Sequence, residues 1–288
     1  MRYRFIDQCR KQFPIKALCR MMQVSTSGYY EWRARPESAR KQANRRLILQ
    51  IRAVHLRSRK SYGRRRVHAQ LRQEGIICSL GRVARLMRAA GLRGCRRRGF
   101  RATTDSRHTL PGAPNLLARD FSTTAANQVW VSDITYLPCQ QGWEYLATIM
   151  DLYNRQIVGW AMQSTLERSL TLKALEMAII QRQPAPGLIH HSDRGSQYAC
   201  WEYQAALSQR GIRCSMSRKG NPWDNAPKES FFGTLKTELV DNWSRLSREQ
   251  AHQEVFNYIE VFYNRQRLHS ALGYQIPVSF ASAPNKAP

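Results

Sequence analysis

Apolar residues in the first part of the chain recur at helical intervals. In residues 1–40, Ile15, Leu18 and Met22 follow the spacing of one buried helical face. Residues 24–28 then contain the small and polar residues of a turn and a helix cap. The segment is therefore predicted to be a small helical unit, and it fits either a helix-turn-helix or a cap made of two short helices.

Residues 41–100 show a clearer pattern of three helices. Leu47 and Val54 lie on the apolar face of the first helix, Gly75 ends the second, and Ser79 is placed to cap the third. The sequence predicts a compact three-helix domain here.

The third of these helices has two contrasting faces. Val83 and Met87 lie on one side, and Arg82, Arg85 and Arg88 lie on the other. An arginine-faced helix that follows a helix and a short turn is typical of a helix-turn-helix recognition helix, although an ordinary amphipathic surface helix has the same pattern. Two further arginine triplets flank the unit: Arg64, Arg65 and Arg66, and Arg96, Arg97 and Arg98.

The pattern changes after a linker. Residues 101–126 contain turn and breaker residues without periodicity. Runs of β-forming residues then predict an antiparallel meander, and two later short strands alternate with helices. This order predicts an α/β fold with a mixed sheet and helices on its faces. The expected strands are 129–137, 143–151, 157–162, 188–191 and 212–217, and the long helices are about 225–240 and 246–264.

Charge divides the chain into two unlike parts. Residues 1–110 contain 29 lysines and arginines against 5 acidic residues, a balance of +24, whereas residues 111–288 carry 17 against 15, only +2. A basic front joined to a nearly neutral rear indicates a polyanion-binding module attached to another function. Arginine dominates the excess, and its planar guanidinium suits phosphate groups.

Cysteine usage and hydropathy favour a protein of a reducing cytoplasm. The seven cysteines are odd in number and include no Cys-x-x-Cys pair, so neither a disulfide framework nor a cysteine zinc site is expected. The N-terminus resembles no signal peptide, and no apolar run has the length of a membrane-spanning helix. We expect no membrane partner.

Three carboxylates stand out by their positions. Asp133 lies within an apolar strand, Asp193 ends another short strand, and Glu229 lies in the first turns of a helix. A single buried aspartate more often caps a turn or pairs with a base, and Asp151 is such a residue and the reserve candidate. Carboxylate oxygens are the ligands that Mg²⁺ prefers, and a cation would relieve their mutual repulsion.

The segments around these carboxylates resemble known motifs. Val131–Tyr136, His191–Tyr198 and Asp224–Phe232 are similar to the three catalytic motifs of bacterial insertion-sequence transposases, specifically the integrase-like product of the second reading frame in frameshifting elements. The 35 residues between Asp193 and Glu229 match the D,D-35-E pattern of that family. The resemblance covers about residues 10–280.

The resemblance implies a fold, a reaction and a cofactor. The implied fold is ribonuclease H-like, a mixed five-stranded sheet flanked by helices and preceded by small all-α helix-turn-helix-like domains. Asp133, Asp193 and Glu229 would be the catalytic ligands of Mg²⁺ or Mn²⁺, as two ions. Water would cleave a phosphodiester at the element end, and the freed 3′-hydroxyl would attack another phosphodiester. Retroviral integrases share this core, but their His/Cys zinc module has no counterpart here.

Further residues are candidates for DNA contact. Asn225 and Lys236 project from the helix of Glu229 on a similar side, and Arg194 adjoins Asp193. Trp223 would either stack on an unpaired base or pack in the protein. The histidines 190 and 191 would orient ligands or simply end a buried strand. The full set of DNA-binding candidates is Arg64, Arg65, Arg66, Arg82, Arg85, Arg88, Arg194, Trp223, Asn225 and Lys236.

The expected function is metal-dependent cleavage and strand transfer of insertion-sequence ends. The expected partners are double-stranded DNA of the element ends and the target, further copies of the chain, and the first-reading-frame protein as partner or fusion. A metal nuclease that cuts without joining and a catalytically inactive DNA-binding regulator are the alternatives. The expected segments are 1–40 (helical), 41–100 (DNA-binding), 101–126 (linker), 127–240 (catalytic core) and 241–288 (C-terminal helix and tail packed on the core).

Overall fold

The computed structural model describes residues 1–95, 112–218, 222–239 and 244–282. The arginine triplet 96–98 and the side chain of Trp223 lie outside this description. The chain divides into two compact units, residues 1–50 and 51–288, which are described separately.

The first unit contains the predicted short helices. They are α1 (Arg2–Cys9), α2 (Ile15–Met21) and α3 (Thr26–Ala34). Ile6, Leu18 and Tyr29 are buried between them. The Ser25 hydroxyl caps α3 by accepting a hydrogen bond from the Gly28 N–H at 3.0 Å, because the first N–H groups of a helix lack partners within it.

The predicted three helices of the basic region are also present. They are α4 (Ala39–Arg57), which crosses into the second unit, α5 (Arg64–Gln73) and α6 (Leu80–Ala89). Gly75 ends α5 with a φ of +76°, a left-handed conformation that glycine adopts without strain. The Ser79 hydroxyl caps α6 through the Arg82 N–H at 3.3 Å. Apolar side chains of α5 and α6 are buried, namely Val67, Leu71, Val83 and Met87.

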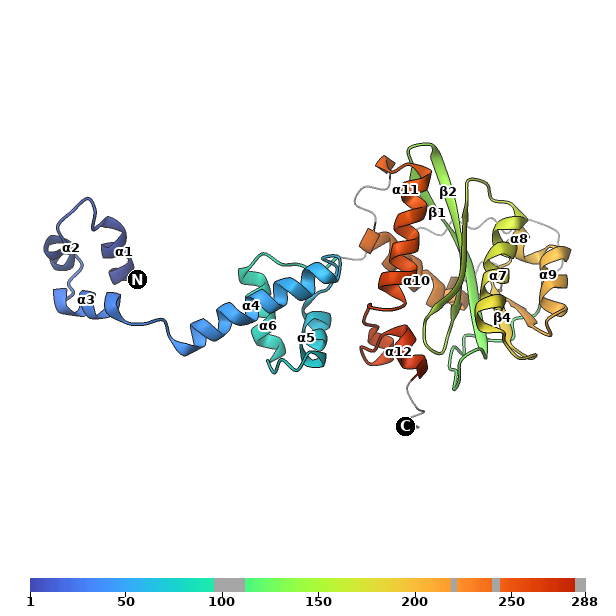
Figure 1. The fold of residues 1–288 in the computed structure, drawn as a ribbon, viewed down its shortest axis with the longest axis horizontal. Helices are drawn as coiled ribbons and strands as arrows, with labels where there is room; N and C mark the ends of the chain where they lie inside the picture. Colours follow the sequence, from blue (N-terminus) through green and yellow to red (C-terminus); the bar gives the residue numbers. More distant parts are fainter. Residues whose placement is uncertain (96–111, 219–221, 240–243, 283–288) are drawn as a thin grey trace. The chain divides into compact units, whose positions relative to one another are not determined.

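A five-stranded mixed sheet forms the centre of the second unit (Figure 1). Its strand order is β3-β2-β1-β4-β5, in which the first three strands are antiparallel and β4 and β5 run parallel to β1. The mixed five-stranded sheet is therefore as predicted. The strands are β1 (Val129–Cys139), β2 (Gly142–Asp151), β3 (Ile157–Gln163), β4 (Ile189–Ser192) and β5 (Arg213–Met216).

One face of the sheet packs against α7 (Arg168–Arg182), α8 (Ser196–Ala199) and α9 (Trp201–Ser208). Trp130 and Leu175 belong to the core between these layers. At Gly159 in β3 an added Cβ would lie 2.2 Å from the Ala174 carbonyl oxygen, so α7 approaches the sheet closely there. The helical segment after β4 is interrupted at Cys200, whose extended backbone separates α8 from α9.

The other face carries α10 (Ala226–Leu239), which follows a 3-10 turn (Pro222–Asn225) and contacts β1 (Figure 1). Next comes α11 (Arg248–Phe256), which was predicted to continue as one regular helix. Instead the chain widens into a π-helix (Asn257–Tyr263), because the Asn264 N–H bonds to the Ile259 carbonyl. The Asn264 side chain then bonds to both backbone groups of Ile157 in β3.

The chain ends in two short elements, a 3-10 turn (Ser270–Leu272) and α12 (Pro277–Ser282). Within the part of the chain that the structure describes, no helix has both the length and the apolar character required to cross a bilayer.

Candidate active site

Strand register brings Asp133 and Asp193 together. In the parallel pair β1–β4, Val129 lies opposite Ile189 and Val131 opposite His191, a constant offset of 60 positions. The same offset separates Asp133 from Asp193. Continuing the register by two residues places them on neighbouring strands, which lie about 4.8 Å apart. Because side chains alternate along a strand, both carboxylates lie on the face that α10 covers.

Asp133 lies in a strongly charged environment. Desolvation and the neighbouring Asp193 raise the pKa of its carboxyl to about 8, and Glu229 contributes in the same direction. The Lys228 ammonium opposes this rise in pKa. Its Nζ donates a hydrogen bond to the hydroxyl of Thr148, the cross-strand neighbour of Asp133. Asp133 therefore responds to both other predicted carboxylates and to a buried lysine.

Asp193 and Glu229 occupy the ends of two elements. The Asp193 Oδ1 accepts the Gly195 N–H at 3.0 Å, which fixes the turn between β4 and α8. Glu229 lies in the first turn of α10, and desolvation raises the pKa of its carboxyl. The middle of β1, the end of β4 and the N-terminus of α10 thus contribute the three carboxylates.

The three carboxylates match divalent cations in chemistry, since they offer hard oxygen ligands and Asp133 combines burial with two like charges. Within the described segments, however, no group of three or more His, Cys, Asp and Glu residues lies close enough together to hold one ion. Asp133 and Asp193 are neighbours by register, and Glu229 is near enough to raise the pKa of the Asp133 carboxyl.

Two further residues of this region face the carboxylates. Asn225 donates a hydrogen bond from its side chain to the Ser132 carbonyl at 3.3 Å, and its Oδ1 is buried without a hydrogen-bond partner among the described residues. The Lys236 ammonium lies 4.9 Å from the centre of the Tyr136 ring. Desolvation lowers the pKa of Lys236, and Asp133 opposes that shift.

The neighbouring histidines are buried in opposite layers. His190 bonds to the Tyr203 hydroxyl at 3.0 Å on the α9 side, and desolvation lowers its pKa to about 3. His191 bonds to the Ser215 hydroxyl at 2.8 Å and to the Asp224 carbonyl at 3.0 Å. Both side chains are therefore engaged within the protein.

Other candidates also have partners. Arg194 donates from Nε to the Ser217 carbonyl at 2.9 Å. Asp151 is buried and accepts the N–H groups of Asn127 and Tyr153 at 2.9 and 3.0 Å, so it caps the turn after β2. These two hydrogen bonds agree with the turn-capping interpretation of Asp151.

The arginine candidates differ in exposure. Arg64 and Arg65 in α5 and Arg85 and Arg88 in α6 are exposed, whereas Arg82 is half-buried. Arg66 lies 5.7 Å from the centre of the Tyr62 ring and 3.7 Å from Glu238 of α10.

Glu238 also binds a second arginine. The Arg267 guanidinium is buried and pairs with the Glu238 carboxylate at 2.8 Å. This buried ion pair connects the C-terminal segment to α10.

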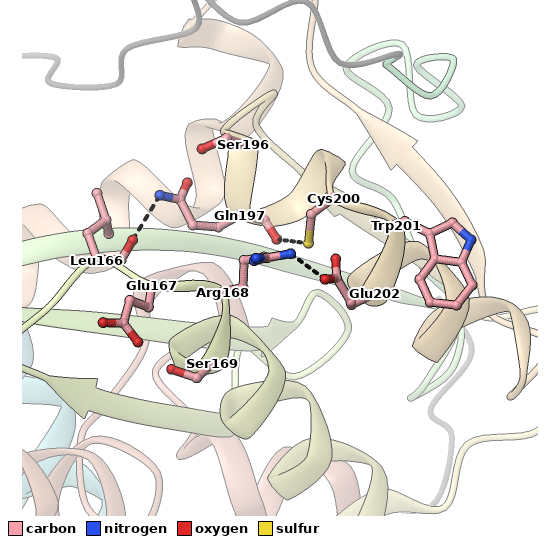
Figure 2. Close-up of a pocket in the computed structure, with 9 residues that line it drawn as sticks. All are labelled: Leu166, Glu167, Arg168, Ser169, Ser196, Gln197, Cys200, Trp201 and Glu202. Atoms are coloured by element: carbon pink, nitrogen blue, oxygen red, sulfur yellow. Dashed lines mark hydrogen bonds and ion pairs between the residues drawn. The ribbon is translucent and has the colours of Figure 1, made fainter.

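A pocket of about 880 Å³ lies between the start of α7 and helices α8 and α9 (Figure 2). Arg168 forms an ion pair with Glu202 across it, and Gln197 donates to the Leu166 carbonyl at 3.3 Å. Its lining includes two glutamates, Glu167 and Glu202, which would repel phosphate. The pocket is distinct from the carboxylate group on the α10 face.

Sequence reasoning missed two buried charged residues of the third motif. Lys228 and Asp224 are almost completely buried. The only available signal was their position in the quoted segment Asp224–Phe232, because burial of a charged side chain depends on contacts made by distant segments.

Comparison with known families agrees with this architecture. Residues 123–222 and 210–277 match two models described as integrase core domains, and residues 42–100 match an HTH-like domain. The chain is 50% identical over 263 residues to an insertion element IS600 protein of 31 kDa from Shigella sonnei, covering 91% of this chain and 97% of that one. It is 40% identical over 282 residues to transposase InsF for insertion sequence IS3A from Escherichia coli strain K12, covering 97% and 98%.

The chain belongs to the insertion-sequence transposase family. The transposase has the expected ribonuclease H-like fold, and its integrase core places it among polynucleotidyl transferases, a group that uses divalent metal ions.

Solved structures show two partial likenesses to the transposase. A simian T-cell lymphotropic virus intasome in complex with PP2A regulatory subunit B56 gamma aligns at 18% identity and a TM-score of 0.48, covering 77% of this chain and 72% of that one. The HTLV-2 integrase catalytic core domain in complex with magnesium aligns at 14% identity and a TM-score of 0.43, covering 56% and 99%.

Proposed function

We propose that the transposase cleaves and joins insertion-sequence ends at a site formed by Asp133, Asp193 and Glu229. The parallel register of β1 and β4, which sets the two aspartates side by side, carries this proposal. The raised pKa of Asp133 supports it, because such a carboxyl gains most from a nearby cation.

These three residues would hold Mg²⁺ or Mn²⁺, as two ions. Bound there, the ions would stabilise negative charge on the attacking and leaving oxygens of an in-line displacement at phosphorus. Protein side chains have a separate task, which is to orient the DNA strand. Lys236 supplies an ammonium and Asn225 an unpartnered amide oxygen on the same side of the sheet.

The reaction proceeds in two phosphoryl transfers. In the first, a water oxygen forms a bond to phosphorus while the bond from phosphorus to the 3′ oxygen breaks, and that oxygen leaves as a hydroxyl. In the second, the oxygen of this 3′-hydroxyl forms a bond to the phosphorus of a target phosphodiester while the bond from that phosphorus to the target's own 3′ oxygen breaks, and that oxygen leaves as a hydroxyl. No covalent bond between protein and DNA is needed.

The HTH-like domain would bind double-stranded DNA. Exposed arginines on α5 and α6 supply cations for phosphate and for base edges in the major groove. We propose that several copies act together on two element ends and one target, and that the first-reading-frame protein acts as partner or fusion.

A joining assay separates the three possible activities. The transposase is incubated with labelled element-end DNA, a target plasmid and Mg²⁺. Joined products support the proposal, whereas cut ends alone would indicate a nuclease and shifted but intact DNA a regulator. D133N, D193N and E229Q should each lose joining and keep DNA affinity, and normal joining by any one of them would remove that residue from the site.

A further inference from the structure

Asp224 is a buried carboxylate at the entrance to the helix of Glu229. It lies in the 3-10 turn that directly precedes α10, and its exposed fraction is 1%. A carboxylate at such a position is costly unless donors surround it. Five hydrogen bonds reach it: from the Arg218 N–H at 3.0 Å, Arg218 Nε at 2.9 Å, Arg218 Nη2 at 2.9 Å, Arg119 Nε at 3.1 Å and Asn115 Nδ2 at 3.0 Å.

These donors come from two segments that are distant in sequence. Arg218 follows β5, while Asn115 and Arg119 belong to the segment that leads into β1. Hydrogen bonds from Arg218 hold the pKa of the Asp224 carboxyl well below its usual range. Asp224 therefore joins three chain segments through one ionised group.

The segment before β1 is held in an unusual backbone conformation beside this carboxylate. Ala118 and Arg119 have φ values of +47° and +71°, which residues with a Cβ rarely adopt. Asn115 stabilises them by accepting the N–H groups of Leu117 and Ala118 at 3.1 and 3.0 Å. Such conformations persist where surrounding contacts fix them, and the bonds to Asp224 are among those contacts.

The backbone of the same turn contacts both aspartate-bearing strands. The Asp224 carbonyl accepts a hydrogen bond from His191 Nε2, two residues before Asp193. Asn225 donates to the Ser132 carbonyl, one residue before Asp133. A single turn therefore fixes the start of α10 against the end of β4 and the interior of β1.

The donor and the acceptor of the hydrogen bond between His191 and the Asp224 carbonyl are defined. A carbonyl oxygen only accepts, so Nε2 carries the proton and Nδ1 accepts from the Ser215 hydroxyl at 2.8 Å. The Ser215 oxygen in turn accepts the Leu116 N–H at 2.9 Å. The chain of hydrogen bonds returns to the segment that carries Asn115 and Arg119.

We propose that Asp224 is a positioning residue that sets where Glu229 lies relative to Asp133 and Asp193. Glu229 follows Asp224 by five residues, and an α-helix transmits a displacement of its first turn to the next. The proposal rests on the proposed roles of the three carboxylates. Asp224 itself contacts no reacting atom.

The test compares D224N with E144Q as a matched control. Glu144 is also 1% exposed and forms an ion pair with Arg248 at 2.9 Å, but it joins β2 to α11. D224N should lower the joining rate at saturating DNA at least tenfold, leave the DNA dissociation constant within twofold, and weaken Mn²⁺ binding, measured by electron paramagnetic resonance, at least threefold. E144Q should lower the melting temperature while leaving Mn²⁺ affinity and the joining rate at the wild-type level.

Arginine variants keep the proposal testable if D224N does not fold. R218M removes two of the five hydrogen bonds and R119M removes one, and both side chains are about half exposed. The bond from the Arg218 backbone N–H survives R218M. R218M should therefore weaken Mn²⁺ binding and joining more than R119M does, and equal or absent effects would contradict the proposal.

The outcomes separate this inference from the proposed function. If E229Q is inactive while D224N binds Mn²⁺ and joins DNA like the wild type, Asp224 is only a structural cap and the inference is wrong. If E229Q joins normally, the proposed function and the inference fail together. Loss of melting temperature in D224N without loss of Mn²⁺ affinity also overturns it.

Discussion

The carboxylate group and the arginine face of α6 differ in how their side chains are held in place. The first depends on strand register and buried contacts, so each carboxylate occupies a unique position. The second lies on one helix, where Arg85 and Arg88 are exposed and Arg82 is half-buried. We therefore expect single substitutions to act in an all-or-none way at the first site and in graded steps at the second.

The largest effect should come from the carboxylates themselves. D133N, D193N and E229Q each remove a charge from a proposed metal ligand, and a loss of several kcal/mol in transition-state stabilisation corresponds to roughly a thousandfold or more in rate. Single-turnover joining rates with Mg²⁺ measure it. A loss of only a few fold in the joining rate of all three variants would contradict the expected difference between the carboxylate group and the arginine face of α6.

A smaller effect, on stability, is expected where α7 packs closely against β3. An added Cβ at Gly159 would lie 2.2 Å from the Ala174 carbonyl, so G159A should lower the free energy of unfolding by about 1–3 kcal/mol.

G233A on α10 is the control for G159A. Nothing lies within 4 Å of the added Cβ at this position. G233A should raise the stability by about 0.5–1 kcal/mol, as alanine favours a helix. Urea unfolding compares the two, and equal changes would refute this packing argument.

A graded effect is expected on the arginine face. The double variant R82A/R85A should weaken DNA binding and reduce the slope of log affinity against log salt by up to about 2 units, because fewer counterions are released. Each single variant should give an intermediate slope. Unchanged slopes would place the DNA-binding surface elsewhere.

A further effect concerns the pH dependence of stability. Burial, followed by the nearby Arg267 and Arg66, lowers the pKa of His269 to about 3, whereas an unfolded histidine titrates near 6.5. Between these values the unfolded chain binds a proton that the folded chain does not. Stability should therefore fall with decreasing pH by up to about 1.4 kcal/mol per unit from this residue.

H269Q should remove that contribution. The free energies of unfolding of the wild type and H269Q are measured by denaturation from pH 7 to pH 4. If the wild type is the more stable protein at pH 7, the two values should converge as the pH falls. Parallel stability curves for wild type and H269Q would show that His269 is protonated equally in both states.

Much of the fold could be predicted from hydrophobic periodicity and motif spacing. The offset between Asp133 and Asp193 is visible in the sequence and equals the strand register, and the cap at Ser79 follows from local chemistry. The inward turn of Arg66 toward Glu238 was not predictable, because it depends on a partner 172 positions away. The five-donor environment of Asp224 was missed for the same reason.

The parallel pairing of β1 with β4 also bears on how such enzymes diverge. Residues 164–188, which connect β3 to β4, do not set the position of Asp193, so this crossover tolerates insertions and deletions as long as the pairing is kept. A slip of one residue in the pairing would instead turn the aspartate to the opposite face of the sheet. Length variation among relatives should accordingly gather in the crossover and spare the strands themselves.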